Sequence, residues 1–191
     1  MAMRSSRPSS LSRTLALVPP AVALVAQQAN GDMFLKVEGV TGESLDKNHA
    51  GWIEVSAMDF KIENAVTLGA GSGTITASKS KGSALTITKL LDRSSPVLFL
   101  GCASGTVYPT VTLDVTRLNG SGTPVTYYKI TLSNVIVSNL GTSSLGERPA
   151  ETVALSYEKI VTDYFMADSK GGVPSTPTTT ATWNFATNSS K

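Results

Sequence analysis

Apolar and polar residues alternate along several short stretches of this chain, as they do in strands with one buried face. The first stretch lies within residues 32–44, which we interpret as an opening strand that runs into a polar, glycine-containing loop. The apolar residues there take one side and the charged residues the other: Met33, Leu35 and Val37 against Lys36 and Glu38. The folded part of the chain is therefore expected to begin at about residue 32.

Four further stretches carry the same alternation and are rich in Val, Thr and Tyr, which favour strands. Asn119-Gly120-Ser121-Gly122 separates two of them and is typical of a hairpin turn. Strands at this spacing, joined by turns, indicate an antiparallel barrel or sandwich. The predicted strands lie within residues 107–118, 127–139, 151–165 and 181–187.

The alternation changes phase at two places, and a change of phase predicts a bulge or a strong bend. Within residues 52–63 the apolar positions are first odd and then even, with the change between Val55 and Met58. A second change falls near Ser133 and Asn134. The intervening segment 68–83 is rich in Gly, Ser and Thr, and we expect a loop or a weak edge hairpin there.

One short helix is predicted after residue 94. Ser95 is placed to cap it, Pro96 to occupy its first position, and Gly105 to end it. We expect this helix to cover one end of the barrel. The fold class is thus mainly β: a compact antiparallel β-barrel of two curled sheets with one short α-helix.

Composition and charge divide the chain into an extension, residues 1–31, and one domain, residues 32–191. The whole chain has a formal net charge of +2, but Arg4, Arg7 and Arg13 lie in the extension, which has no acid. Without them 13 basic residues face 14 acidic ones. The domain therefore has no electrostatic reason to bind nucleic acid or acidic lipid.

The extension has three arginines, an apolar run over residues 15–26 that is interrupted by Pro19-Pro20, and small residues after it. This pattern resembles a secretory signal, although the double proline does not suit a helix. The run is also too short to span a bilayer, so we expect no membrane insertion. A signal peptide, an unstructured extension and a start codon assigned too far upstream all stay open.

The residues that could carry catalysis are few. His49 is the only histidine, Ser44 and Asp46 are merely its neighbours in a loop, and we expect His49 to be exposed or at an interface. Cys102 is the only cysteine, which excludes an internal disulfide, and we expect it to be a small buried apolar residue. The glycine-rich segment 69–73 lacks the lysine of a phosphate loop. We predict no metal site, no cofactor and no enzyme activity, which favours a structural or binding role.

Six segments, taken in order, resemble the Hcp (haemolysin-coregulated protein) family, the tube subunits of the bacterial type VI secretion system. No single segment is decisive, but together they cover the chain from Asp32 to its end. They are DMFLKVEGVTGES, LLDRSSPVLFLGCASG, TVTLDVTR, YYKITLSNVIVSN, PAETVALSYEKIVTDYF and ATWNFATN.

The resemblance implies hexameric rings that stack into a tube, assembled in the bacterial cytoplasm and then secreted inside a contractile sheath. It implies a spike protein at the tip and small effector proteins carried in the lumen. It also implies that the loop after the first strand, residues 42–51, reaches the neighbouring ring. The residues expected in this ring-stacking loop are Gly42, Glu43, Ser44, Asp46, Lys47 and His49.

Alternative functions stay open on the residues alone. The chain could be a tail-tube or adaptor subunit of a phage-like or extracellular contractile injection particle. It could also be a secreted β-barrel binding module, which a genuine signal peptide within residues 1–31 would favour.

Overall fold

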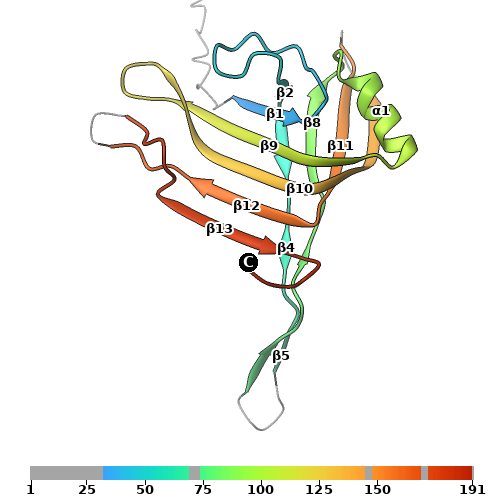
Figure 1. Cartoon of the computed structure of the whole chain (residues 1–191), viewed down its shortest axis with the longest axis vertical. Coiled ribbons are helices and arrows are strands. Elements are labelled where there is room, and N and C mark those ends of the chain that lie inside the picture. The colour runs from blue at the N-terminus through green and yellow to red at the C-terminus, as the bar shows by residue number, and fades with distance from the viewer. Residues whose placement is uncertain (1–31, 69–73, 145–147, 169–171, 191) are drawn as a thin grey trace, which may run out of the picture.

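A curved sheet of nine antiparallel strands dominates the computed structural model, which describes residues 32–68, 74–144, 148–168 and 172–190 (Figure 1). The strand order is β2-β1-β9-β10-β11-β8-β3, with β12 beside β10 and β13 beside β12. Residues 1–31 and the glycine-rich segment 69–73 lie outside the described residues. The nine strands are β1 (Met33–Val37), β2 (Ile53–Val55), β3 (Ala57–Asp59), β8 (Leu85–Leu90), β9 (Val107–Leu118), β10 (Pro124–Ser143), β11 (Ala150–Ser156), β12 (Lys159–Tyr164) and β13 (Thr179–Asn184).

The two ends of the main strand order meet in one bent segment. β2 pairs with β1, β3 pairs with β8, and only Ser56 separates β2 from β3. The amide and the hydroxyl of Ser56 both donate to the carbonyl oxygen of Thr88, at 2.8 and 3.0 Å. β2 and β3 do not pair with each other, so the ladder is not closed by hydrogen bonds. The bend predicted from the change of phase in this segment is confirmed.

β10 is 20 residues long and serves both halves of the sheet. On one side it pairs with β9, and on the other it pairs first with β12 and then with β11. The change of partner falls at Asn134, whose φ of 52° is left-handed. The buried positions shift there from Ile130 and Leu132 to Val135 and Val137. The predicted irregularity near Ser133 and Asn134 is therefore confirmed, because the left-handed residue turns the opposite face inward.

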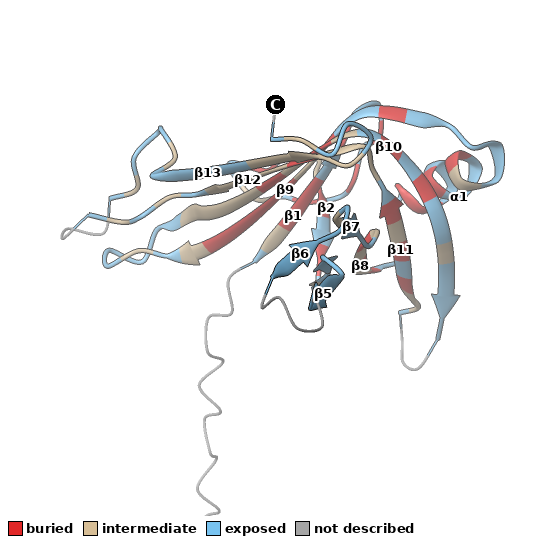
Figure 2. Ribbon diagram, turned by 90° about the horizontal axis from the view of Figure 1, so that it is seen from below, coloured by how far each residue is buried: buried red, intermediate tan, exposed pale blue. Residues whose placement is uncertain are grey.

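The core lies inside the curve of the sheet, and buried residues recur at intervals along the long strands (Figure 2). Full burial of one such side chain contributes about 1.5–3 kcal/mol. Both sheet halves and the helix supply residues that are almost completely buried, including Leu35, Ile53, Leu85, Ile87, Leu98, Leu113, Ile130, Leu132, Val153 and Leu155.

The helix α1 (Ser95–Ser104) begins near the end of β8 and packs against β10. Pro96 lies in its first turn and Gly105 ends it with a left-handed φ of 67°, as predicted. The prediction that Ser95 caps the helix is wrong: the cap position is Ser94, whose hydroxyl donates to Asp92 and not to the helix backbone. The hydroxyl of Ser95 instead turns into the interior, where it donates to Glu151.

A narrow hairpin, which we call the arm (residues 61–68 and 74–83), extends away from the barrel (Figure 1). The expectation of a weak edge hairpin is therefore confirmed, and the pairing starts earlier in the chain than expected. Its strands are β4 (Ile62–Glu63), paired with β7 (Lys81–Gly82), and β5 (Val66–Leu68), paired with β6 (Ile75–Ala77). All four are exposed to solvent (Figure 2).

Candidate assembly surface

The predicted ring-stacking loop, residues 42–51, is folded tightly on itself. Together with its two flanking residues we call it the His49 loop (residues 41–52). The amide of Gly42 donates to Gly51 O at 2.8 Å, and the amide of Gly51 donates to Ser44 O at 2.8 Å. A Cβ atom at Gly42 would lie 2.2 Å from the carbonyl oxygen of Trp52, and Gly51 has a φ of 74°. Both glycines are required by this backbone path. The loop therefore has a defined backbone conformation that its own hydrogen bonds and glycines maintain.

The six residues predicted for this loop divide into exposed and buried ones. Glu43 and Lys47 are exposed, and between them Leu45 is 95% exposed at the surface of the loop. Ser44 and His49 are buried, with His49 only 3% exposed. The expectation that His49 is exposed or at an interface does not hold within this chain. The loop covers the histidine because Phe34, on the outer face of β1, provides an aromatic surface under it.

His49 lies between two carboxylates and two aromatic rings. Its Nδ1 atom is 2.8 Å from Asp46 Oδ1, and its Nε2 atom is 3.2 Å from Asp114 Oδ2 on β9. The imidazole stacks on Phe34 with a centroid distance of 4.3 Å and meets the edge of Trp52 at 4.9 Å. These contacts tie the loop to the barrel through a residue that the sequence predicted to be exposed or at an interface.

Asp46 organises the loop from within. Its Oδ1 atom accepts hydrogen bonds from the amides of Asn48 and His49, each at 2.9 Å, in addition to the ring of His49. Burial raises the pKa of this carboxyl, but the hydrogen bonds from the His49 ring and from the two amides outweigh it and hold the pKa below its ordinary value. Asp46 is thus kept ionised beside the histidine.

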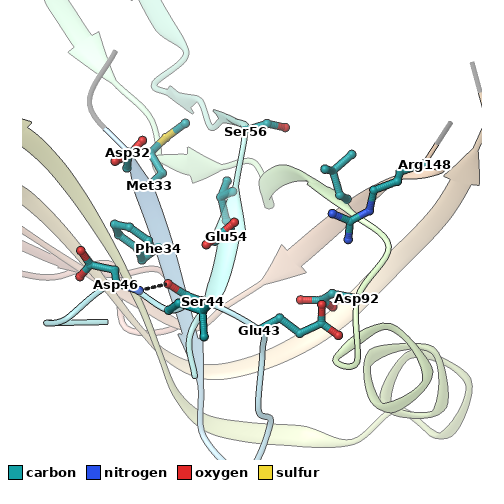
Figure 3. Close-up of a pocket in the computed structure, with 13 residues that line it drawn as sticks. Asp32, Met33, Phe34, Glu43, Ser44, Asp46, Glu54, Ser56, Asp92 and Arg148 are labelled. Carbon is teal, nitrogen blue, oxygen red and sulfur yellow. Dashed lines mark hydrogen bonds between the residues drawn. The ribbon is translucent and has the colours of Figure 1, made fainter. Parts of the chain in front are cut away.

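A groove of about 600 Å³ lies beside the loop (Figure 3). Five carboxylates line it, and Arg148 is the one cationic residue among its lining. The negative charge of this groove favours the binding of basic side chains over that of phosphate groups. The carboxylates come from the start of β1, from the loop, from β2 and from the turn before α1: Asp32, Glu43, Asp46, Glu54 and Asp92.

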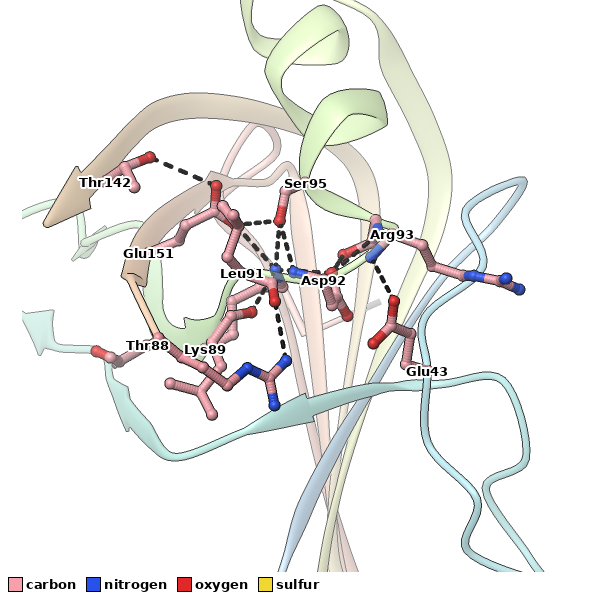
Figure 4. A network of polar contacts seen from close by, with 12 residues as sticks. Glu43, Thr88, Lys89, Leu91, Asp92, Arg93, Ser95, Thr142 and Glu151 are labelled. Atoms are coloured by element: carbon pink, nitrogen blue, oxygen red, sulfur yellow. Dashed lines mark hydrogen bonds and ion pairs between the residues drawn. The ribbon is translucent and has the colours of Figure 1, made fainter. Parts of the chain in front are cut away.

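A second buried polar cluster fixes the start of α1, and sequence reasoning missed it (Figure 4). Lys89, at the inward-facing end of β8, has no exposed side-chain surface. Its Nζ atom is 2.8 Å from both Glu151 Oε2 and Asp92 Oδ1, and 2.9 Å from Ser95 Oγ. The backbone amide of Arg93 donates to Glu43 at 3.0 Å, which links the His49 loop to the same turn.

The arm presents apolar side chains to solvent. Val66, Leu68 and Ile75 are 59%, 72% and 68% exposed. Isolated two-stranded hairpins are marginally stable in water, so these residues gain from being covered. In Figure 1 the arm and the His49 loop lie at opposite ends of the long axis of the molecule.

The described residues hold no group of three or more potential metal ligands. Within the same residues, no helix has the length and apolar character needed to cross a membrane.

Comparison with known proteins places these features in a family. A family model described as the type VI secretion system effector Hcp matches residues 34–164. The chain belongs to the Hcp family. It is 34% identical over 135 residues to the protein hcp1 of Pseudomonas aeruginosa, an alignment that covers 70% of this chain and 82% of that protein.

Solved structures agree with this assignment. The fold matches Hcp1 of Salmonella typhimurium with a TM-score of 0.67 and 32% identity, covering 85% of this chain and 99% of the other. It matches another structure, described as a type six secretion system protein, with a TM-score of 0.77 and 27% identity, covering 84% and 99%. The predicted resemblance to Hcp, the mainly β fold with one helix and the role in type VI secretion are confirmed.

Proposed function

We propose that this Hcp chain forms hexameric rings that stack into the tube of a type VI secretion system. The observation that carries the proposal is the family match over residues 34–164, which includes most of the barrel, α1 and the arm. The exposed apolar arm at one end and the exposed Leu45 at the other supply surface that stacking would cover. Such self-association is head to tail, because the two ends differ.

The same proposal assigns the partners and the location. Rings assemble in the cytoplasm inside a contractile sheath, receive a spike protein at the tip, carry small effectors in the lumen and are then secreted. The chain acts as a structural protein and not as an enzyme. Support comes from the membership of the Hcp family, whose members are structural secretion proteins.

The test of the stacking role is a change at the exposed point of the His49 loop. Leu45→Asp should leave rings intact and reduce their stacking, since the change replaces an exposed apolar side chain with a carboxylate that stacking would have to bury. Light scattering separates single rings from stacks, and electron microscopy shows their shape. Val107→Asp is the matched control, because Val107 is also exposed but lies outside the loop. Unchanged stacking in Leu45→Asp would exclude this loop from ring contact.

The division of the chain into residues 1–31 and a barrel domain of residues 32–191 is part of this proposal. A tube exported by the secretion machine has no need of a signal peptide. The intact mass of the protein from cells and from medium decides between a retained extension, a cleaved one and a later start. A cleaved form found only in the medium would contradict export by the type VI route alone.

A further inference from the structure

The hydrogen bonds of His49 require more protons than a neutral histidine carries. Neutral imidazole has one N–H group, so one of its nitrogens donates and the other accepts. Here both nitrogens face carboxylate oxygens, at 2.8 Å on Asp46 and 3.2 Å on Asp114. Ionised carboxylates accept only. The two bonds therefore exist together only when the Asp46–His49–Asp114 chain holds one proton beyond the single N–H of neutral imidazole.

The surroundings place this proton on the ring. Phe34 offers its π face to the imidazole at 4.3 Å, which suits a cation. The amides of Asn48 and His49 donate to Asp46 and so favour its ionised form. The proton lies in the interior, since the side chains of His49 and Asp114 are 4% and 8% exposed.

The other charges that face this group come from two strands. Lys129 on β10 approaches Asp114 Oδ1 at 3.5 Å, and the hydroxyl of Thr126 donates to Asp114 Oδ2 at 3.4 Å. Lys36 on β1 lies over the ring of Trp52, 5.7 Å from its centroid, on the residue whose edge meets His49. With a protonated ring, the two carboxylates are balanced by His49 and Lys129. Loss of the ring proton leaves one buried negative charge without compensation.

We propose that this single proton fastens the His49 loop to the barrel, so that the loop keeps its closed form when His49 is charged and opens when the proton leaves. The contact broken on deprotonation is the one to Asp114, because it is the longer and because Asp46 belongs to the loop itself. Since the loop is the segment proposed above to touch the next ring, stacking should weaken as the ring of His49 loses its proton, and in this respect the inference rests on the proposed function.

Two direct measurements test the proton without reference to stacking. His49 is the only histidine in the sequence, so ¹⁵N-histidine labelling of the full chain gives one pair of ring-nitrogen signals that reports protonation and tautomer. Hydrogen exchange reports the loop through the amides of Gly42, Ser44 and Gly51, which bond to loop carbonyls. Protection is expressed relative to the intrinsic exchange rate and followed from about pH 5 to about pH 9, while the ring-nitrogen signals report the charge of His49 at each pH.

We expect both nitrogens to carry protons while the loop is protected. Protection should fall by about 10-fold to 100-fold as the ring loses its proton, the worth of one hydrogen bond to a charged group. His49→Gln should show the low protection at every pH. Asp114→Asn should keep the protection after the ring has lost its proton, because its amide donates to the unprotonated Nε2 of a neutral ring. Asp59→Asn, the same exchange at an exposed carboxyl on β3, should behave as the wild type.

Three results would overturn the proposal: a neutral ring in a protected loop, protection that does not change when the ring titrates, or an Asp114→Asn loop that is unprotected at every pH. Light scattering on the same samples separates the two ideas. If the loop opens as the ring loses its proton while stacks persist, the proton fastening stands and the role of the loop in stacking fails.

Discussion

Lys89, His49 and Asp114 lie in the interior because each meets a partner of opposite charge. Lys89 is in phase with the buried Leu85 and Ile87 of β8, so the alternation along this strand places its side chain inside. No local sequence pattern predicts that His49 is buried. Its partner Asp114 is 65 residues away, and only the folded sheet brings the two together.

Replacement of Lys89 should be among the most damaging single changes in the protein. Lys89→Met leaves Glu151 and Asp92 close together and without their cation, which costs about 3–5 kcal/mol of unfolding free energy. Urea unfolding at one protein concentration measures the loss. Lys79→Met, at an exposed lysine of the arm, is the control and should change the unfolding free energy little. Equal stability of the two variants would contradict the structural role of the cluster.

Asp46 should make the unfolding free energy of the protein depend on pH in the acid range. Because its folded-state pKa is depressed, its stabilisation is complete above the ordinary carboxyl pKa and is lost as the pH falls through the folded-state value. Asp46→Asn should cost about 1 kcal/mol at neutral pH, a modest value because the group is partly exposed. The difference from the wild type should vanish in acid, as urea unfolding at several pH values would show. If the difference in unfolding free energy between the two proteins did not change with pH, the charge of Asp46 would not be the source of its stabilisation.

The helix α1 illustrates what local pattern does and does not determine. Pro96 and Gly105 mark its two ends correctly, because both act through their own backbone geometry. Ser95 does not cap the helix as predicted, because its hydroxyl donates to Glu151, a residue 56 positions away. The bend at Ser56 and the turn of β10 at Asn134 were predictable, since each must change the phase of the buried positions.

Close contact between α1 and β9 leads to a prediction for Gly101. A Cβ atom there would lie 2.1 Å from the Tyr108 hydroxyl oxygen, so Gly101→Ala should cost about 1–3 kcal/mol by forcing the helix outward. Urea unfolding measures the change. Adding Tyr108→Phe removes the nearest atom and should recover part of the loss. Gly141→Ala on β10, with open space around its Cβ, is the control. Failure of Tyr108→Phe to recover any stability would show that another contact limits the site.

At the scale of the whole molecule, the barrel and the arm have separate tasks. The arm residues Val66, Leu68 and Ile75 add little to the core, since all three are largely exposed. Changing all three to Thr keeps the preference for strands and should leave thermal unfolding of the barrel within a few degrees of the wild type. Stacks measured by light scattering should shorten. Stacks of full length would show that the apolar surface of the arm lies outside the assembly contacts.

The pairing of β1 with β9 sets a delay during synthesis. Met33 pairs with Val115, about 80 residues later in the chain. At ribosomal rates of about 5–20 residues per second, the edge of β1 that faces β9 waits roughly 4–16 s before its partner exists. β2 can pair with the other edge of β1 much earlier, because it follows within the next segment of the chain. A cell that makes many copies of this chain at once therefore exposes many β1 edges that await β9, and such open edges are where newly made chains can associate wrongly.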